Sequence, residues 1–313
     1  MSYLQRLTEL LAQGVRQIPA ERRQRHVRFL TASQNRDGGF SGREGGSDLY
    51  YTGFALRSLS LLEALTPRIA EPAGQFLRGS LAGQTSVVDF FSLLYASLLV
   101  QVSSGLDIFA DSPPDWPQRV ADLLESFRTA DGGYAKGPGG AAGSTYHSFL
   151  VTLCYQLLGR EVPKPDRLVE FALSRRRDDG GFVEIAPMRR SGTNPTAAGV
   201  GLLQVVTPQI FTEQPVLRQG VIDFLVEMAS VEGGIRANGR VPLADLLSTF
   251  TGGWTLAELG GLDRLDRTDL RHYAEAAELP QGGFRGGLWD DGHDVEYTFY
   301  GLGVLGLVHL RGA

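Results

Sequence analysis

The feature that most constrains the fold is a pair of glycines that recurs along the chain. The pair precedes an aromatic or aliphatic residue five times, as DGGF at 37–40, DGGY at 131–134, DGGF at 179–182, EGGI at 232–235 and QGGF at 281–284. The later copies lie about 48 to 53 residues apart, and the first gap is about twice as long. The spacing therefore predicts six units, the second of which has lost its glycine pair near residues 81–86.

Each unit contains two segments with helical patterning. A segment with one charged face precedes the glycines, and a loop of about ten residues then leads to a nearly continuous apolar segment. The first segments lie near 22–32, 67–79, 117–129, 166–177, 216–229 and 268–277, and the apolar segments near 49–65, 87–102, 146–158, 196–206, 246–259 and 295–310. Because the apolar segments lack a polar face, we expect them to be buried behind the first segments.

This pattern predicts an all-α fold in which six helix pairs close into an alpha/alpha six-barrel, or toroid, as a single domain over residues 20–313. Closure of the ring brings the terminal units together, which removes the need for polar caps. Residues 1–19 are predicted to form an extra N-terminal helix outside the ring. The double glycine supplies the positive φ that ends each first helix.

Composition argues against several classes of partner. The formal net charge is -5 and the sequence pI is about 5.6, so the whole protein does not attract nucleic acid. The chain begins without the basic and apolar pattern of a secretory signal, and no unbroken apolar run approaches about 18 residues. We expect a cytoplasmic protein without an integral membrane segment.

The six loops after the glycines should emerge on one face of the ring, around the mouth of any central cavity. Nearly every loop carries a base soon after its glycines, namely Arg43, Lys136, Arg189 with Arg190, Arg236 with Arg240, and Arg285. Guanidinium forks in such a crown could bind a diphosphate. Acidic neighbours, among them Asp48 and Asp290, leave open the alternative that these bases are ordinary solvated loop charges.

Aromatic residues gather where the apolar segments begin. A ring of helices this wide must fill its middle with side chains or enclose a cavity lined by them. Core packing accounts for many of these rings, but some are candidates for the cavity lining: Tyr51, Tyr146, Phe250, Trp254 and Tyr300.

Three stretches carry a resemblance to a known family: SQNRDGGFSGREGGSDLYYTGFALRSL, DGGYAKGPGGAAGSTYHSFLVTL and QGGFRGGLWDDGHDVEYTFYGLGVLGL. They resemble the beta subunits of protein prenyltransferases, above all the Rab geranylgeranyltransferase type, in a superfamily that includes squalene and diterpene cyclases. The resemblance implies the same alpha/alpha barrel and an isoprenoid diphosphate ligand such as geranylgeranyl or farnesyl diphosphate. It also implies a helical-repeat alpha subunit as partner, and the sequence leaves open whether this chain has one or self-associates.

The family binds one zinc ion through an Asp, a Cys two residues later and a His at the start of the last apolar helix. Asp245 matches the Asp, but Leu247 stands in place of the Cys and Tyr297 in place of the His. Zinc therefore remains conceivable only with substitute ligands, and His293 and Asp294 are the candidates to join Asp245.

The resemblance also indicates where a diphosphate would bind. The family places bases in the loop before its zinc Asp, and Arg236 with Arg240 fall in that loop. The family's diphosphate-binding His has no clear counterpart, and Asn194 or Arg190 lie nearest to its place. With Lys136, the predicted diphosphate-binding residues are thus Arg236, Arg240, Arg190 and Lys136.

These observations favour a prenyltransferase-like protein that binds an isoprenoid diphosphate in a central apolar cavity and transfers the prenyl group without the family's zinc site. One alternative is a protonation-type terpene cyclase, because Asp294-Val295-Glu296-Tyr297 is similar to the Asp-x-Asp-Asp motif of such enzymes, with Glu296 in the acid's place. Another is a non-catalytic isoprenoid carrier or scaffold. The candidate catalytic residues are Asp245, Asp294, Glu296 and Tyr297.

Overall fold

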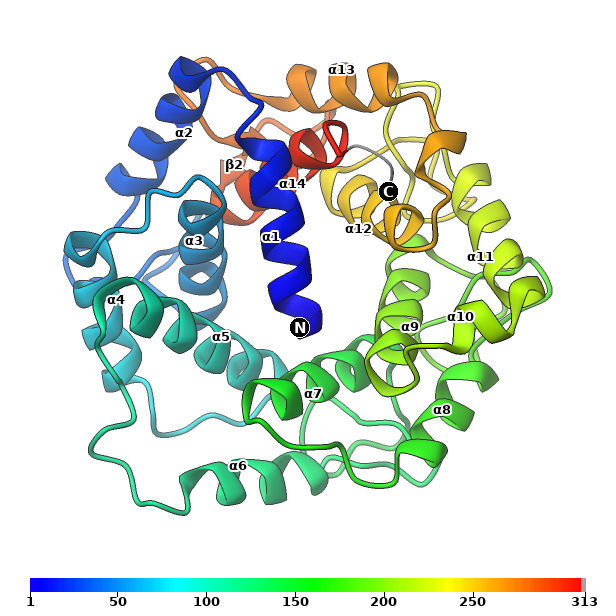
Figure 1. The fold of residues 1–313 in the computed structure, drawn as a ribbon, viewed down its shortest axis with the longest axis horizontal. Helices are drawn as coiled ribbons and strands as arrows, with labels where there is room; N and C mark the ends of the chain where they lie inside the picture. The colour runs from blue at the N-terminus through cyan, green and yellow to red at the C-terminus, as the bar shows by residue number, and fades with distance from the viewer. Residues whose placement is uncertain (311–313) are drawn as a thin grey trace. The chain divides into compact units, whose positions relative to one another are not determined.

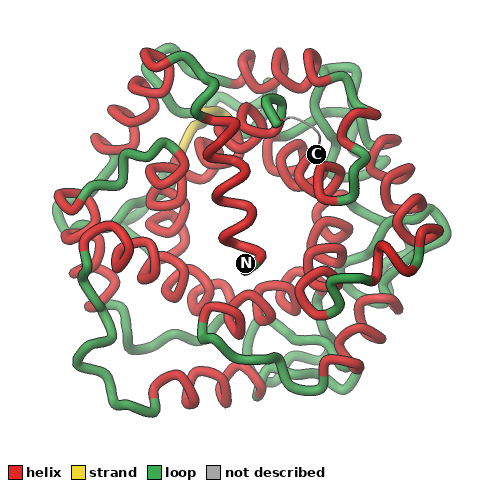
Figure 2. Tube along the Cα trace, viewed as in Figure 1, coloured by secondary structure: helices red, strands yellow, loops and turns green. Residues whose placement is uncertain are grey.

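The computed structural model describes residues 1–310, which are helical apart from loops and two short strands (Figure 2). Each predicted segment forms a helix. The pairs are α2 (Ala20–Ala32) with α3 (Leu49–Leu61), α4 (Pro67–Gly79) with α5 (Val87–Ser104), α6 (Trp116–Glu125) with α7 (Thr145–Leu157), α8 (Pro165–Ser174) with α9 (Thr193–Val206), α11 (Pro215–Glu227) with α12 (Leu246–Glu258), and α13 (Arg267–Ala277) with α14 (Val295–Leu307).

Four further elements escaped the sequence analysis because they are too short to show a periodic pattern. They are α10 (Ile210–Glu213), the 3-10 helix η1 (Leu262–Arg264), β1 (Phe284–Arg285) and β2 (His293–Asp294). The two strands pair antiparallel, with Phe284 opposite Asp294, and they frame the loop between the last glycine pair and α14.

The described chain separates into two compact units, each larger than one of the six repeats, and from here on the first and second unit mean these two. The first comprises residues 1–84, 89–113 and the described residues from 270 onward, and the second comprises 85–88 and 114–269. In the first unit α14 packs against α3, so the last apolar helix lies beside the first (Figure 1). In the second unit α9 packs against both α7 and α12, and α8 covers α9. The expected contact between the first and last repeats is confirmed, whereas a single domain over 20–313 stays a prediction.

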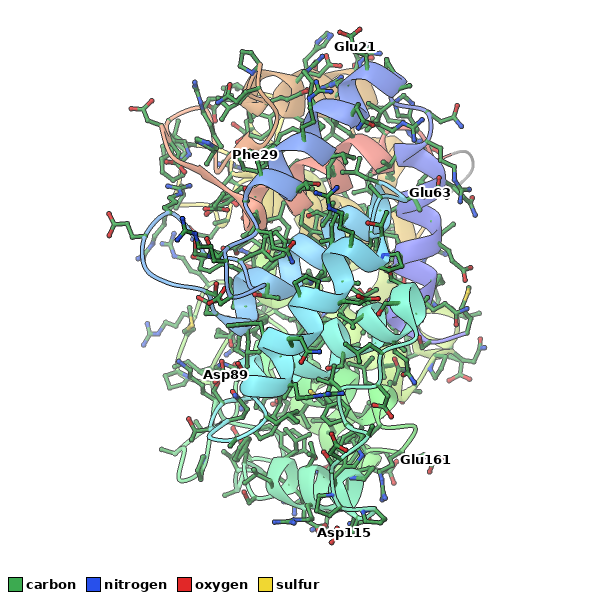
Figure 3. The ribbon with its side chains drawn as sticks, turned by 90° about the vertical axis from the view of Figure 1, so that its left-hand side faces the viewer. Glu21, Phe29, Glu63, Asp89, Asp115 and Glu161 are labelled. Carbon is green, nitrogen blue, oxygen red and sulfur yellow. The ribbon has the colours of Figure 1, made fainter. Side chains whose placement is uncertain are left out.

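Helix α1 (Tyr3–Val15) does not lie where the sequence suggested. It packs against α14 and α3, which are apolar helices, and not outside the helix pairs (Figure 1). Leu11 and Val15 on its apolar face are fully buried. Its backbone approaches α14 so closely that a Cβ on Gly14 would lie 2.0 Å from the carbonyl oxygen of Gly306. Arg16 then donates to Glu63, which lies just beyond the end of α3 (Figure 3).

The turns after the glycines are fixed by a hydroxyl group from the following helix. In four of the six repeats the backbone N–H of the residue after the glycine pair donates to that hydroxyl at 2.8–2.9 Å: Phe40 to Thr52, Tyr134 to Ser148, Phe182 to Thr196 and Ile235 to Thr249. These four hydroxyl residues are almost fully buried. A buried N–H needs such a partner, so the recurring hydroxyl belongs to the turn and not to chemistry.

The acid that precedes the glycine pair closes the same loop from its other side. Asp179 accepts hydrogen bonds from the N–H of Gly181 and from the hydroxyl of Ser191, twelve residues further on. The first glycine of this pair, Gly180, has φ +89°, and a Cβ there would lie 2.2 Å from the carbonyl oxygen of Gly220 in α11. Only glycine satisfies both conditions, which agrees with the structural role expected for the pair.

Replacement of Thr196 by Val tests this design, because Val has nearly the same shape but cannot accept the hydrogen bond from Phe182. We expect the free energy of unfolding to fall by about 1–3 kcal/mol, the cost of leaving a buried N–H unpaired. Denaturant unfolding of both proteins measures the change. Thr212→Val, at an exposed threonine of α10, should change stability by no more than about 0.5 kcal/mol. Equal effects in the two variants would contradict the assignment.

Helix α5 is the one helix within residues 1–310 that is long and apolar enough to cross a membrane. Its 18 residues have a mean hydropathy of 1.5, and 61% of that window is buried inside the protein. Asp89 and several serines interrupt the apolar run of this helix, so the sequence showed no unbroken membrane-length segment there. Such burial is typical of a core helix in a water-soluble fold, and a cytoplasmic location stays a prediction.

Candidate functional site

Asp245 and Asp294 have the same local role in the two units. Each precedes an apolar helix in extended backbone conformation and accepts a hydrogen bond from the N–H three residues further on, Asp245 from Ser248 at 2.7 Å and Asp294 from Tyr297 at 2.9 Å. This is the N-capping arrangement, which satisfies a free backbone donor and places negative charge at the helix N-terminus. Each of these predicted site residues therefore has a structural function.

In the first unit Asp294 also belongs to an ion cluster centred on Arg43. The guanidinium of Arg43 donates to both carboxylate oxygens of Asp290, at 2.9 and 2.6 Å, and through Nε to Asp294 at 3.0 Å. Its carbon lies 5.4 Å from the ring centre of Tyr297. The hydrogen bonds from Arg43 hold the pKa of Asp290 below its usual range. Two carboxylates thus occupy the fork of this base, as the alternative interpretation of the loop charges expects.

Glu296 is the second residue of α14, and its environment differs from that of Asp294. It is largely buried, and its Oε1 accepts a hydrogen bond from the phenol of Tyr50 at 2.6 Å and a longer one from Tyr300 at 3.4 Å. Burial raises the pKa of the Glu296 carboxyl above its usual range despite the hydrogen bond from Tyr50, and the charge of Asp294 adds to this shift. A carboxyl held in this way keeps its proton to higher pH than an ordinary glutamate, which suits it to act as a general acid or base.

Beside Glu296, aromatic rings from three helices of the first unit surround a single cation. The guanidinium carbon of Arg57 in α3 lies 3.9 Å from the ring centre of Phe54, 4.9 Å from Phe299 in α14, and 5.8 and 5.9 Å from Tyr95 and Phe91 in α5. Phe54 and Phe299 also meet edge to face. The rings therefore form an aromatic wall that stabilises positive charge through their negative faces.

In the second unit Asp245 belongs to a polar network and not to an ion cluster. Both of its oxygens accept from Ser248, whose hydroxyl lies 3.3 Å from the amide nitrogen of Asn194 in α9. The oxygen of Asn194 accepts in turn from Thr251 at 2.7 Å. Burial raises the pKa of Asp245, although the hydrogen bonds from Ser248 act against this shift. Asn194, a candidate from the sequence, is thus engaged with α12.

The predicted diphosphate-binding bases of the second unit differ in whether their side chains already form hydrogen bonds within the protein. Arg236 donates to the backbone carbonyls of Glu227 and Met228 at the end of α11. Arg190, Arg240 and Lys136 are exposed, and within residues 1–310 no side-chain hydrogen bond is formed by any of the three. Arg236 therefore supports the end of α11, while the other three can turn toward a ligand.

The predicted lining residues divide by exposure. Phe250 (5% exposed) and Trp254 (3%) are buried along α12, and Tyr300 (7%) is buried beside Glu296. Tyr51 is partly exposed, and its ring packs over the backbone of Gly42. Tyr146 is 39% exposed at the start of α7. Tyr51 and Tyr300 therefore share the first unit with Glu296, and the other three belong to the second.

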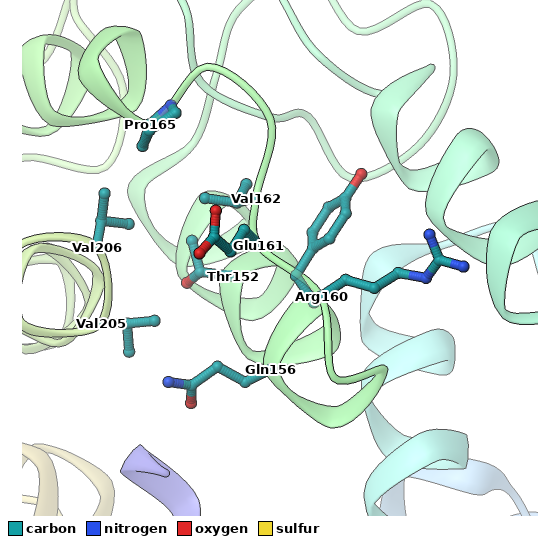
Figure 4. Close-up of a pocket in the computed structure, with 9 residues that line it drawn as sticks. Thr152, Gln156, Arg160, Glu161, Val162, Pro165, Val205 and Val206 are labelled. Carbon is teal, nitrogen blue, oxygen red and sulfur yellow. The ribbon is translucent and has the colours of Figure 1, made fainter.

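A separate hollow of about 390 Å³ lies in the second unit at the carboxyl ends of α7 and α9 (Figure 4). Its lining includes Thr152, Gln156 and the loop residues Arg160 to Val162, with Val205 and Val206 opposite. No residue predicted for the functional site lies in its wall. The hollow is therefore distinct from the Gly-Gly loops, which precede the amino ends of these helices.

Comparison with known families agrees with this architecture over almost the whole chain. The model of the prenyltransferase alpha-alpha toroid domain matches residues 3–184, 74–238 and 196–312. The chain belongs to the prenyltransferase alpha-alpha toroid family. The predicted fold class is thereby confirmed, as is the likeness to prenyltransferase beta subunits and terpene cyclases. A search of curated protein sequences gives no match.

Solved structures of a prenyltransferase and of a terpene cyclase are both similar to this chain. Protein geranylgeranyltransferase-I of Candida albicans, complexed with GGPP, has a TM-score of 0.73 and 14% identity, covering 91% of this chain and 90% of that one. A type II terpene cyclase from Scytonema, complexed with geranylgeranyl dihydroxybenzoate, has a TM-score of 0.61 and 14% identity, covering 97% and 98%. An unsaturated glucuronyl hydrolase specific for heparin reaches 0.65 at 13% identity, covering 96% and 97%. These identities establish the toroid fold alone.

The residues at the family's zinc position do not fit the metal. Leu247 has no donor atom, and Asp245 already caps α12. His293 is exposed and Asp294 is buried on β2, so these neighbours point to opposite faces of the strand. Within residues 1–310 no group of three or more His, Cys, Asp or Glu side chains is placed to hold a metal ion.

Sequence reasoning missed Arg57 and the partners that surround it. One signal was present, because Arg57 is the lone base in the apolar segment YYTGFALRSLSLLEAL. A charged residue inside a helix that is apolar all round needs a partner or a ligand. The rings of Phe91, Tyr95 and Phe299 could not be assigned to it, because they come from helices that only tertiary packing brings together.

Proposed function

We propose that this toroid protein binds an isoprenoid diphosphate against the aromatic rings of its first unit and transfers the prenyl group without zinc. The observation that carries the proposal is the convergence of four rings from α3, α5 and α14 around the guanidinium of Arg57, an apolar wall that already accommodates one positive charge. Cleavage of an allylic diphosphate develops positive charge on the prenyl carbon, which such rings would shelter. The complex of the Candida enzyme with GGPP supports the same class of ligand.

Transfer without zinc requires another way to activate the acceptor. In the proposed reaction the bond between the prenyl carbon and the diphosphate oxygen breaks, and an O–H, N–H or S–H group of the acceptor bonds to that carbon. The proton released by the acceptor passes to the carboxylate of Glu296, whose raised pKa suits it as general base. Diphosphate leaves with the electron pair, so that charge and atoms balance.

The first test is a titration of metal-stripped protein with geranylgeranyl diphosphate and with geranylgeraniol, repeated with zinc. We expect the diphosphate to bind more tightly, with or without zinc. A Phe54→Leu/Phe299→Leu variant, which removes two of the rings, should bind both isoprenoids about 10-fold more weakly. Arg119→Ala, at an exposed base of α6, should bind normally. Failure of both isoprenoids to bind would contradict the proposal.

A protonation-type terpene cyclase is the second candidate, and the setting of Glu296 favours it specifically. The protonated carboxyl of Glu296 would donate its proton to a terminal alkene, the rings would shelter the resulting carbocation, and a proton would finally return to a base. This reaction keeps the diphosphate on the product, whereas prenyl transfer releases it. Mass analysis of the products, together with a diphosphate-release assay, therefore separates the two reactions.

A non-catalytic isoprenoid carrier would keep the aromatic wall but perform neither reaction. Its signature is tight binding of the diphosphate with no release of diphosphate and no new carbon skeleton over many hours. The presence of a buried Glu296 with two phenol partners favours chemistry over simple storage, because a carrier gains nothing from a carboxyl held out of water.

A further inference from the structure

The side chain of Arg57 is unusual among the arginines that contact aromatic rings in this protein. Arg128 stacks on Tyr134 and forms an ion pair with Glu125 at 2.7 Å. Arg175 stacks on Phe171 and is paired with Asp131. In each case a carboxylate compensates the guanidinium charge.

Arg57 has no such compensation. Within residues 1–310 its guanidinium donates one hydrogen bond, from Nε to the carbonyl oxygen of Gly53 at 3.1 Å in its own helix. The charge of Arg57 acts on Glu296, but within residues 1–310 the two form no ion pair, and Oε1 of Glu296 accepts from the phenols of Tyr50 and Tyr300 instead. Both terminal nitrogens of Arg57 therefore remain available to an acceptor that the protein does not supply.

The surroundings restrict what this acceptor can be. The rings of Phe54, Phe299, Tyr95 and Phe91 lie 3.9–5.9 Å from the guanidinium carbon and restrict how the fork can turn before any ligand arrives. A preoriented fork matches the paired oxygens of a phosphate or a carboxylate. The same rings offer apolar contact to whatever carries this anion, so a small hydrophilic ion would use only part of the site.

We propose that Arg57 binds the anionic head group of an isoprenoid, a phosphate or carboxylate, within the wall formed by α3, α5 and α14. This inference rests on the proposed function and refines it. The head group is held inside the aromatic wall of the first unit by a residue of an apolar helix, in addition to any contact with the loop bases. The reacting end of the isoprenoid is thereby placed beside Glu296.

The experiment compares wild type, Arg57→Met and Arg57→Lys in titrations with geranylgeranyl diphosphate, geranylgeranic acid, geranylgeraniol and inorganic pyrophosphate. We expect Arg57→Met to bind the diphosphate about 10- to 100-fold more weakly and the alcohol unchanged. Arg57→Lys keeps the charge but loses the fork, and should fall between the two. The carboxylic acid tests whether phosphate is required, and pyrophosphate tests whether the head group suffices.

Arg16→Met is the matched control, because it removes a surface guanidinium of the same unit that pairs with Glu63. It should leave all four affinities unchanged. Thermal unfolding checks that each variant is folded. If Arg57→Met does not fold, the comparison is made with Arg57→Lys alone. Unchanged diphosphate affinity in a folded Arg57 variant, or equal losses for diphosphate and alcohol, would overturn the inference while leaving the proposed function standing. Failure of wild type to bind any of the four compounds would contradict both.

Discussion

Replacing Glu278 with Gln should lower the free energy of unfolding by about 3–5 kcal/mol, the range typical when one partner of a buried ion pair is removed. Glu278 follows α13, and its side chain is only 8% exposed. It accepts hydrogen bonds from Arg22 at 2.6 Å and from Arg25 at 3.3 Å, both in α2. The substitution would remove the charged partner of Arg22 and Arg25, whose side chains are only partly exposed.

His26 is the third neighbour of Glu278. It is fully buried, with Nε2 3.2 Å from Glu278. Its Nδ1 accepts from the N–H of Gly283 at 3.1 Å, so the ring proton resides on Nε2, which faces the carboxylate of Glu278. The ring also stacks on Phe284 at 4.9 Å. One carboxylate thus joins α2 of the first helix pair to the glycine turn of the last.

The same cluster predicts how stability depends on pH. Burial alone would raise the pKa of Glu278, but the hydrogen bonds from His26 and Arg22 lower it to about 2. The stabilisation is therefore fully present above the ordinary pKa of a glutamate, about 4.3, and is lost as the pH falls from there toward 2. Wild type should lose about 3 kcal/mol over this window that the Gln variant does not lose.

Denaturant unfolding at several pH values measures both effects. Glu275→Gln is the matched control, because Glu275 also accepts from Arg22, at 2.9 Å, but is 38% exposed. Its removal should cost no more than about 1 kcal/mol. Similar losses in the two variants, or a wild-type acid transition no steeper than that of Glu278→Gln, would show that the cluster does not hold the terminal helix pairs together.

The helix pairs could be predicted because their signals are local. The glycine pair demands positive φ, as at Gly180, and the segments between glycine pairs have helical periodicity. The boundaries of α4 and α9 lie within a few residues of the predicted segments. By contrast, the position of α1 depends on the close approach of Gly14 and Gly306, nearly 300 residues apart in sequence, which no local pattern reports.

The candidate site could be predicted only in part, for the same reason. Glu296 and Tyr300 were identified from the sequence, and the structure brings them together. Asp294 was identified too, but its oxygens are used for capping and for Arg43, and neither role is visible without the fold. Arg57 was passed over because its environment is built by α5 and α14. Motif resemblance therefore located the helix starts, whereas packing decided which side chains there remain available.

If Glu296 exchanges a proton with the acceptor or the isoprenoid, Glu296→Gln should reduce turnover by about 100- to 10,000-fold, the usual contribution of a general acid or base. Gln has the same shape and can still bond to Tyr50, so the dissociation constant for geranylgeranyl diphosphate should change by less than about threefold. Glu71→Gln, at an exposed acid of α4, should leave turnover unchanged.

The pH profile then separates the two proposed reactions. Because burial raises the pKa of Glu296, the ionisation that controls turnover should lie above the ordinary glutamate range. A general base is active when ionised, so prenyl transfer should rise with pH through this pKa, whereas cyclisation by the protonated carboxyl should fall. Turnover by Glu296→Gln equal to that of wild type would remove Glu296 from the mechanism.

Tyr50→Phe, which deletes the phenol bonded to Oε1 of Glu296, should move the pH dependence of turnover to higher pH, because this hydrogen bond favours the ionised carboxylate.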